Sequence, residues 1–436
     1  MTDATPDSVS TSERVVTLDA IRGLAVLGIL VMNVVEFAHP FEAYENPAYA
    51  GGSTGADLWT WYAQITLFDG KMRALFSMLF GAGLVLFAQR MTANGQGERA
   101  TDVLLRRCLW LVPFGIVHRF GLQWSGDILY QYGLLGALAL AFRGLRARTL
   151  AILGVCTLLC FVPIGLWTYT KNVRTRDRAV EAEQKAAAGE TVTPELAAAQ
   201  RRYEARRNAI PPRPEAVQAE VTAMRQGYTG VFAHRWDYHH TFQSTYLYAY
   251  FSFDVFSMLL LGMALAKLGY FAGRGSTTLH VGIVVAGALT AGFVYLWARD
   301  LASRGFSAVA FESKLVRDLT YPFTRTVIAL AWASALILVM RAGALRLATT
   351  ALAAVGRMAF TNYVLQTVCC TLLFFGYGLG WYGSLSRAQL MLVVVAVSIV
   401  QITVSIAWLR HHRFGPLEWA WRSLTWWRRQ PMRLRN

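Results

Sequence analysis

Residues 17–33 read Thr17-Leu-Asp-Ala-Ile-Arg-Gly-Leu-Ala-Val-Leu-Gly-Ile-Leu-Val-Met-Asn33. This stretch is apolar except for a charged pair near its start, Asp19 and Arg22, and an amide at its end, Asn33. Residues three apart lie on one face of a helix, so Asp19 and Arg22 can pair. Asn33 would lie roughly 16 Å beyond Arg22, about half the hydrocarbon thickness of a bilayer. Polar groups at such depth are costly and mark candidate functional sites.

The composition of the whole chain agrees with a membrane helix at residues 17–33. The chain has 436 residues, of which 55% are hydrophobic and 16% are charged. Soluble proteins of this size rarely reach that balance. We therefore predict an all-α, polytopic membrane helical bundle. The first 14 residues are polar, and because no convincing cleavage site follows them, no signal peptide is expected.

Apolar stretches long enough to cross a bilayer recur along the chain. Ten are predicted: 17–38, 72–90, 106–123, 126–143, 149–170, 243–268, 278–299, 321–341, 355–377 and 388–410. An interfacial helix rich in Trp and Tyr is expected at 56–70, before the second of them.

Basic residues indicate the orientation. The net charge is +16, and the basic residues lie mainly at the ends of apolar runs and in the tail 410–435. The loop 39–57, by contrast, carries three acidic residues and no Lys or Arg. This pattern predicts that both termini are cytoplasmic and that the protein lies in the plasma membrane. The expected partners of the basic residues are anionic lipid head groups rather than nucleic acid.

The domain organisation is predicted to be one membrane domain, 1–436, with an extracytoplasmic helical insertion at 171–240. Ala, Glu and Arg dominate the insertion and favour helix. Thr193 is expected to cap a helix with Pro194 at its first position. The insertion is either a solvated spacer or a cap over an outward-facing cleft.

Several kinds of site are not indicated by the sequence. There is no Gly-rich phosphate loop, no HExxH and no GxSxG. The cysteines form no CxxC, so neither a metal site nor a disulfide framework is expected. They are Cys108, Cys156, Cys160, Cys369 and Cys370.

His118 and Asp127 are the strongest candidates for catalysis. They lie close to each other across a short hairpin between two apolar stretches. A carboxylate beside an imidazole is the pairing that a general base needs, although Asp127 is also suited to cap a helix. Asn33 is expected at a similar depth, where it either joins helices or contacts a substrate.

Cations supply the candidate binding residues. Arg22, oriented by Asp19, and Arg107 are candidates to hold a phosphate at the inner surface, or are ordinary positive-inside charges. Lys71 and Arg73 are candidates to contact substrate, and Arg73 is spaced to pair with Asp69 at i, i+4. The intramembrane Asp254 needs a cationic partner: Lys71, Arg73 or another arginine. The remaining candidates for substrate binding are Trp124, Arg235, Asn362 and Gln366; helix packing is the alternative for the two amides.

Five stretches together resemble one known family. They are Asp19-Ala-Ile-Arg-Gly23, His118 to Tyr132, Gly227-Tyr-Thr-Gly-Val-Phe-Ala-His-Arg235, Gly356-Arg-Met-Ala-Phe-Thr-Asn-Tyr363 and Gly415-Pro-Leu-Glu-Trp419. They resemble the YeiB-like family, domain of unknown function 418, with 241–425 as its C-terminal part. That family looks like a branch of the transmembrane acyltransferase superfamily. In the type three acyltransferases, the first helix carries an Arg followed, after ten residues, by a catalytic His. Arg22 matches that Arg, and Asn33 stands at the His position.

The resemblance implies transfer of an acyl group from cytosolic acyl-CoA, a co-substrate, to an extracytoplasmic or lipid-linked acceptor. His118 would take the acceptor proton, Asp127 would orient His118, and Asn33 would stabilise the oxyanion. Neither a tightly bound cofactor nor a metal is expected. The alternatives are a transporter or exporter of a small anionic or amphipathic solute, and a scaffold that performs no chemistry.

Overall fold

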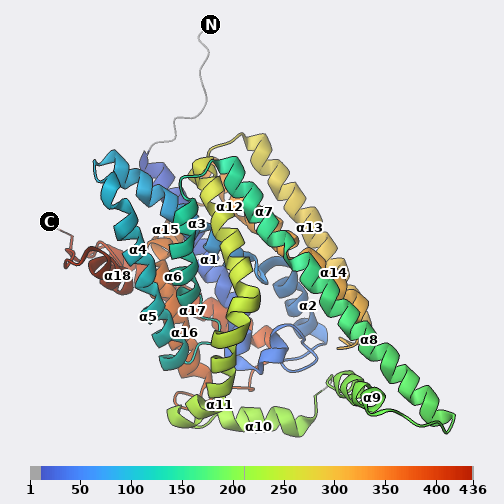
Figure 1. Cartoon of the computed structure of the whole chain (residues 1–436). Helices are drawn as coiled ribbons and strands as arrows, with labels where there is room; N and C mark the ends of the chain where they lie inside the picture. The colour runs from blue at the N-terminus through green and yellow to red at the C-terminus, as the bar shows by residue number, and fades with distance from the viewer. Residues whose placement is uncertain (1–10, 211, 435–436) are drawn as a thin grey trace.

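The computed structural model describes residues 11–210 and 212–434, and within these ranges the chain is all-α (Figure 1). The described residues contain no β-strand, and their one extended contact is an isolated antiparallel bridge between His412 and Arg433. In chain order the principal helices are α1 (Thr11–Ala38), α2 (Gly55–Ala63), α3 (Lys71–Ala93), α4 (Ala100–Leu109), α5 (Leu111–Ile116), α6 (Leu129–Ala139), α7 (Ala147–Leu159), α8 (Phe161–Ala187), α9 (Pro194–Arg207), α10 (Pro214–Met224), α11 (Tyr228–Thr241), α12 (Ser252–Lys267), α13 (Thr277–Ser303), α14 (Phe311–Arg341), α15 (Arg346–Arg357), α16 (Ala359–Phe374), α17 (Arg387–Leu409) and α18 (Pro416–Trp426).

Six helical stretches of the described chain are long and apolar enough to cross a membrane. They are Val16–Ala38, Gly55–Ala93, Ala147–Ala187, Thr277–Ser303, Phe311–Arg341 and Arg387–Leu409. A bent pair of helices, Tyr228–Tyr248 and Ser252–Lys267, would be a seventh membrane span if the two are counted as one. Two further apolar helices are shorter, Leu129–Phe142 and Ala359–Phe374. The membrane character is therefore clear from the fold, whereas the number ten stays a prediction.

Peripheral helices carry the exposed apolar side chains, as a bilayer requires. Leu289 of α13 is 74% exposed and Leu392 of α17 is 71% exposed. By contrast, α1, α3, α12 and α16 are largely buried and form the centre of the bundle.

The predicted stretch 106–123 is not one helix. It divides at Trp110 into α4 and α5, and the π-helical segment Val117–Gly121 follows. Pro113 lacks the backbone N–H that would continue the hydrogen bonds across this break.

Glycines allow two pairs of helices to touch through their backbones. A Cβ on Gly23 or on Gly356 would lie less than 3.0 Å from a carbonyl oxygen of the other helix, α15 or α1 respectively. For Gly356 that oxygen belongs to Asp19. Gly81 and Gly262 allow the same close backbone contact between α3 and α12. Small residues at such contacts are the usual means of close packing between membrane helices.

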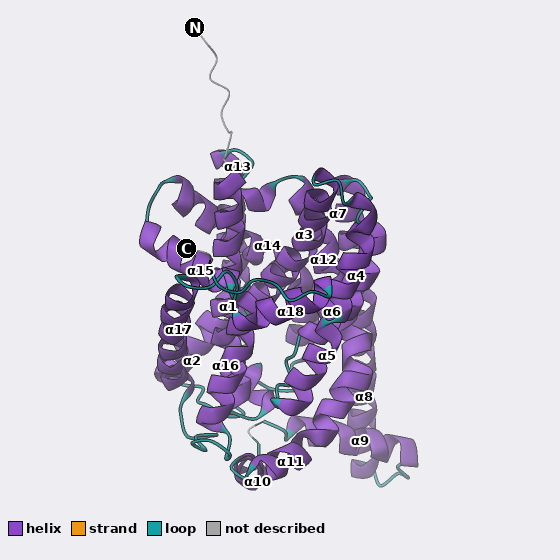
Figure 2. Cartoon of the chain, turned by 90° about the vertical axis from the view of Figure 1, so that its left-hand side faces the viewer, coloured by secondary structure: helices purple, strands orange, loops and turns teal. Residues whose placement is uncertain are grey.

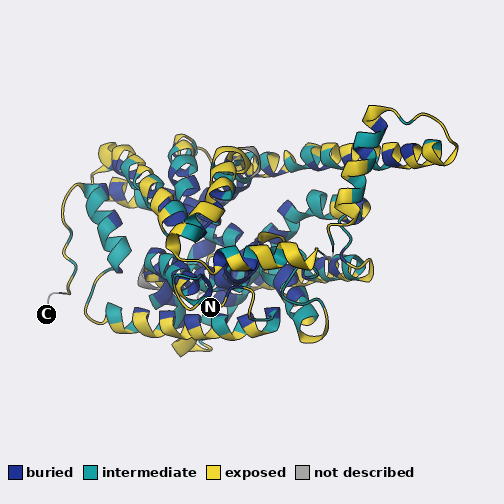
Figure 3. Cartoon of the chain, turned by 90° about the horizontal axis from the view of Figure 1, so that it is seen from below, coloured by how far each residue is buried: buried dark blue, intermediate teal, exposed yellow. Residues whose placement is uncertain are grey.

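The insertion is helical, and its helices lie at the end of the bundle opposite to the start of α1 (Figure 1). We call this the insertion end, and the other the N-terminal end. Thr193 accepts a hydrogen bond from the N–H of Leu196 with Pro194 at the first position of α9, which confirms the predicted cap. From the insertion end, α8 is seen to extend past the bundle with exposed residues along most of its outer part (Figure 3).

The last helix, α18, crosses one side of the bundle near α4 and α15 (Figure 2). The Glu418 carboxylate accepts the backbone N–H groups of Phe360 and Thr361, at 2.6 and 3.0 Å, and the Thr361 hydroxyl. It thereby satisfies free donors at the N-terminus of α16. Burial raises the pKa of Glu418. The Arg107 guanidinium lies 3.7 Å from the ring centroid of Trp421, so α18 also attaches to α4.

Candidate functional site

A cavity of about 480 Å³ lies among α1, α3, α6, α8, α12 and α14, in the half of the bundle nearer the insertion end. Charged side chains line it from several helices. The cations are Arg73, Lys314, Arg317 and Arg325, and the acids are Glu36, Glu45, Asp69, Asp127, Asp254 and Asp318. Charged side chains inside an apolar bundle are energetically costly, so a cluster of this size marks a candidate functional site.

Asp254 is held between two arginines at the wall of this cavity. Its carboxylate accepts hydrogen bonds from Arg73 of α3 and Arg325 of α14, while Asp254 itself belongs to α12. The expectation that Asp254 has a cationic partner is confirmed, and Arg73 was one of the candidates. Since the three side chains come from three helices, the cluster also ties the bundle together.

The predicted pair between Asp69 and Arg73 is wrong. Gly70 between them is in the left-handed conformation, with φ at 68°, so Asp69 lies outside helix α3 and not one turn below Arg73. Asp69 lies instead 3.6 Å from Arg317 and accepts from the Tyr321 hydroxyl at 3.3 Å. Lys71 is buried away from the cavity and donates to the carbonyl oxygen of Ile65.

His118 is hydrogen bonded through both ring nitrogens. Nδ1 lies 2.8 Å from Oδ1 of Asp127, and Nε2 lies 2.8 Å from Oγ1 of Thr367. Asp127 also accepts the backbone N–H groups of Leu129 and Tyr130, so it caps the start of α6 as well. A carboxylate acceptor fixes the proton on Nδ1, and Nε2 then accepts from the Thr367 hydroxyl.

The local sequence explains why His118 and Asp127 meet. A Cβ on Gly115 would lie less than 3.0 Å from the Asp127 carboxylate and from the backbone N of Tyr130, so only glycine allows this approach of α5 to α6. Asp127 lines the cavity, whereas His118 is buried behind it in the π-helical segment.

Asn33 lines the same cavity as Asp127. Its half-buried amide has no hydrogen-bond partner among the described side chains and backbone groups. The structure therefore brings Asn33, Asp127 and Arg73 to one space, with His118 one layer behind. Asn33 is free to donate to a ligand or to a developing oxyanion.

The three residues predicted to hold a phosphate lie elsewhere. Arg22 donates to Asp19 at 2.7 Å, and neither residue lines the cavity. Arg107 is held against Trp421 by its cation–π contact. None of the three lines the cavity, so the structure does not join Arg22 and Asn33 in one cavity.

Two predicted substrate residues connect elements at the insertion end instead of lining the cavity. Trp124 stacks on Phe37, with ring centroids 4.1 Å apart, and donates to the Tyr363 hydroxyl. Arg235 of α11 donates to Ser125 Oγ at 2.8 Å and lies 4.0 Å from Glu36. Arg235 therefore links the insertion to the bundle.

The two predicted amides of α16 hold helices together. Asn362 donates to Ser405 of α17 at 2.9 Å. Gln366 donates to the carbonyl oxygen of Val26 in α1 and to Gln401 of α17. This arrangement is the packing alternative considered for both amides.

Arg325 is the main residue of the cavity that sequence reasoning missed. It stands near the start of the predicted span 321–341, in a stretch that also contains Tyr321. An arginine inside an apolar span is itself a signal for a site, and this signal would have found it.

Comparisons with known proteins relate the whole chain to others. A family model described as "Protein of unknown function (DUF418)" matches residues 265–428. The uncharacterized protein YeiB of Escherichia coli is 31% identical over 95% of this chain and 96% of its own. The uncharacterized protein YxaH of Bacillus subtilis is 30% identical, covering 97% of this chain and 96% of its own. No solved structure matches.

Proposed function

Since this chain belongs to the YeiB-like DUF418 family, whose matched relatives are uncharacterized, we propose its function from geometry. The proposed activity is transfer of an acyl group from cytosolic acyl-CoA to an extracytoplasmic or lipid-linked acceptor bound in the cavity. The observation that carries the proposal is the hydrogen bond between His118 and Asp127, because Asp127 lines a membrane cavity that also holds the free amide of Asn33.

Each residue has one task in the proposed reaction. Nε2 of His118 faces Thr367 of α16 and not the cavity. We therefore propose that α16 moves away from His118 when the acceptor binds, and that Nε2 then takes the proton of the acceptor hydroxyl or amine. The acceptor atom attacks the thioester carbonyl, and the Asn33 amide donates to the resulting oxyanion. The carbon–sulfur bond then breaks, and CoA leaves as a thiol with the proton from His118. Asp127 keeps the imidazole in the required tautomer throughout.

The donor is proposed to bind first at the opposite end of the bundle, and its thioester is proposed to reach the cavity in a second conformation that opens the packed space beside α1. Arg22, oriented by Asp19 at 2.7 Å, and Arg107 are proposed contacts for its phosphates. The support for these contacts is the positive-inside pattern of the sequence, which predicts that basic residues at the ends of apolar runs lie on the cytosolic side.

We expect His118→Ala and Asp127→Asn to lower acyl transfer by about 10²- to 10⁴-fold, the usual contribution of a positioned general base. The measurement is transfer of label from radioactive acetyl-CoA to lipid or added sugar acceptors in proteoliposomes. His411→Ala, an exposed histidine near α18, is the matched control and should keep the wild-type rate. Unchanged rates in the first two variants would remove the proposed base.

A topology of ten spans, with both termini in the cytoplasm of the plasma membrane, is also part of the proposal. It predicts that green fluorescent protein fused after α18 fluoresces and that alkaline phosphatase inserted between α8 and α9 is active. The swapped fusions should be inactive. An active phosphatase fused after α18 would overturn this orientation.

Transport is the second candidate, because interrupted helices border the cavity. The turn at Asp69–Gly70 precedes α3, and the π-helical segment Phe242–Phe251 precedes α12. Broken helices at a central site are typical of transporters, and π segments often occur at functional sites. Uptake of a labelled anion into vesicles at equal rates by wild type and His118→Ala, without acyl transfer, would favour transport.

A further inference from the structure

We propose that the cavity binds an uncharged amphiphile whose headgroup carries hydroxyl groups. The headgroup would bond to the neutral polar side chains of the cavity, and the hydrocarbon chain would lie between α8 and the π-helical segment Phe242–Phe251. This inference rests on the proposed function in treating the bound molecule as the acceptor, and it names the chemical class of that acceptor.

The charged side chains of the cavity already have partners in the protein. The ion pairs within the lining are Asp254 with Arg73 and Arg325, Arg317 with Glu45 and Asp69, and Lys314 with Asp318. Of the two remaining acids, Glu36 accepts from the Ser125 hydroxyl and lies 4.0 Å from Arg235. Asp127 is bonded to His118 and to two backbone N–H groups. A charged headgroup would lose its hydration here and find no free counter-charge, so an uncharged ligand is favoured.

Four neutral polar side chains of the cavity, by contrast, have no hydrogen-bond partner among the described residues. They are Asn33 of α1, Tyr44, Gln131 of α6 and Tyr238 of α11. Gln131 is only 2% exposed, and it follows Asp127 by four residues, so both lie on one face of α6. Buried polar groups are normally hydrogen bonded, so these four are ready to bond a polar ligand.

The chemistry of these four groups selects a hydroxyl-bearing headgroup. Amides and phenols both donate and accept hydrogen bonds, and a ligand hydroxyl does the same without carrying a charge. An alkyl amine would be protonated at neutral pH, and an amide nitrogen is a poor nucleophile. A hydroxyl bound by Gln131 would also lie beside Asp127, which holds the proposed base His118. The same hydroxyl would therefore be placed to accept the acyl group.

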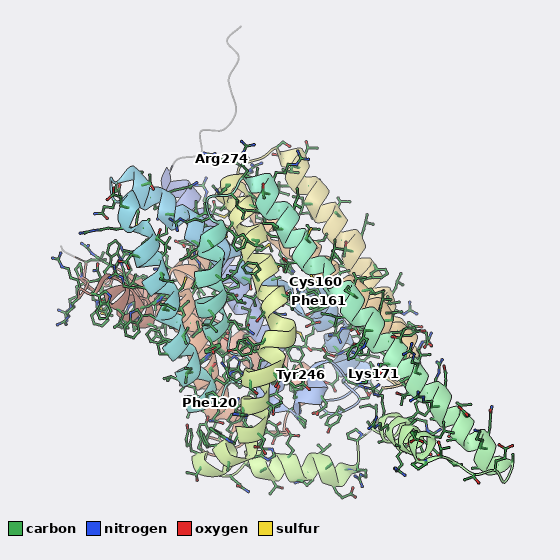
Figure 4. All side chains as sticks on the ribbon, in the orientation of Figure 1. Phe120, Cys160, Phe161, Lys171, Tyr246 and Arg274 are labelled. Carbon is green, nitrogen blue, oxygen red and sulfur yellow. The ribbon has the colours of Figure 1, made fainter. Side chains whose placement is uncertain are left out.

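Another part of the cavity lining is apolar. Its residues are Phe161, Ile164 and Gly165 of α8, together with Phe242 and Phe251. Figure 4 shows α8, with Phe161 labelled, and the segment with Tyr246 on the two sides of this region. The neighbouring α8 residues Leu166 and Trp167 are 44% and 61% exposed and do not line the cavity, as expected for side chains that contact lipid. A hydrocarbon chain can therefore enter here from the membrane.

The test measures binding apart from catalysis. Protein in phosphatidylcholine nanodiscs is titrated with radiolabelled monolauroylglycerol, and binding beyond that of empty discs gives a Kd as a mole fraction of the lipid. Binding should saturate, and unlabelled monolauroylglycerol should displace the label. Dodecyl phosphate, dodecyltrimethylammonium and methyl laurate should not displace it at the same mole fraction, because they carry an anion, a cation and no hydroxyl respectively. Glycerol should not displace it either, since it lacks the hydrocarbon chain.

Two variants test the neutral polar groups. Gln131→Leu should weaken monolauroylglycerol about three- to tenfold, as expected for loss of one hydrogen bond, and Tyr238→Phe should do the same. The matched controls are Gln184→Leu, exposed on α8, and Tyr203→Phe on α9, and neither residue lines the cavity. Because the Gln131 amide has no partner in the described chain, Gln131→Leu should not lower the Tm of the unliganded protein, and a weaker Kd would not come from unfolding.

The outcomes separate the binding site from the reaction. Binding that does not saturate, equal displacement by either charged amphiphile or by methyl laurate, or an unchanged Kd in both Gln131→Leu and Tyr238→Phe would overturn the inference. His118→Ala should bind monolauroylglycerol as wild type does, because His118 does not line the cavity. Binding by wild type without any acyl transfer would refute the proposed reaction and leave the binding site standing. Transfer to another acceptor without binding of monolauroylglycerol would do the reverse.

Discussion

Asp254→Ala is expected to lower the free energy of unfolding by about 3–5 kcal/mol, the usual cost of removing one partner from a buried ion pair. The reason is that Arg73 and Arg325 would face each other inside the bundle without their shared carboxylate. Unfolding of the purified protein in mixed micelles with increasing dodecyl sulfate gives the measurement. Asp300→Ala breaks an exposed pair with Arg304 and should cost less than about 1 kcal/mol.

A double variant separates charge from packing in this cluster. Asp254→Leu with Arg325→Met removes one charge of each sign and leaves Arg73, which is 23% exposed in its side chain and can reach the cavity. It should recover much of the loss, because apolar replacements of buried ion pairs are often neutral or stabilising. If it were as unstable as Asp254→Ala, the loss would come from packing rather than from unpaired arginines.

Gly356→Ala should cost about 3 kcal/mol, at the upper end of the usual range for overpacking. Its new Cβ would overlap the Asp19 carbonyl oxygen of α1, and a backbone atom cannot move aside as a flexible side chain can. The same micelle titration measures the change. Gly292→Ala is the matched control: its Cβ meets nothing within 4 Å, and alanine favours helix, so this variant should be slightly more stable. Equal stability of the two variants would show that α1 and α15 separate easily.

Six of the ten predicted spans coincide with helices of the described chain that are long and apolar enough to cross a membrane, because apolar runs of this length are strong signals. The meeting of His118 with Asp127 could also be predicted, because a short hairpin fixes it. The pairing of Asp254 with Arg325 could not be specified, since it joins side chains 71 positions apart whose contact depends on how α12 packs against α14. The Asp69 prediction failed because Gly70 interrupts the helix that the spacing assumed.

Arg22 and Asn33 do not share a cavity, and the reason is packing. Both residues belong to α1, but helix spacing does not say what fills the space beside the helix. Between them Gly28 lies against Met72 of α3, and Leu30 is fully buried in the same core. The cavity is therefore confined to the insertion half of the bundle.

The contact of Glu418 with the start of α16 has a consequence for how the protein is made. The cap follows Phe360 by 58 positions in the chain. During synthesis α16 therefore enters the membrane with free N–H groups and is completed only after α17 and α18 have followed. A ribosome that stalls between α16 and α18 would leave a chain whose cavity residues are all present but whose central helix still lacks its cap.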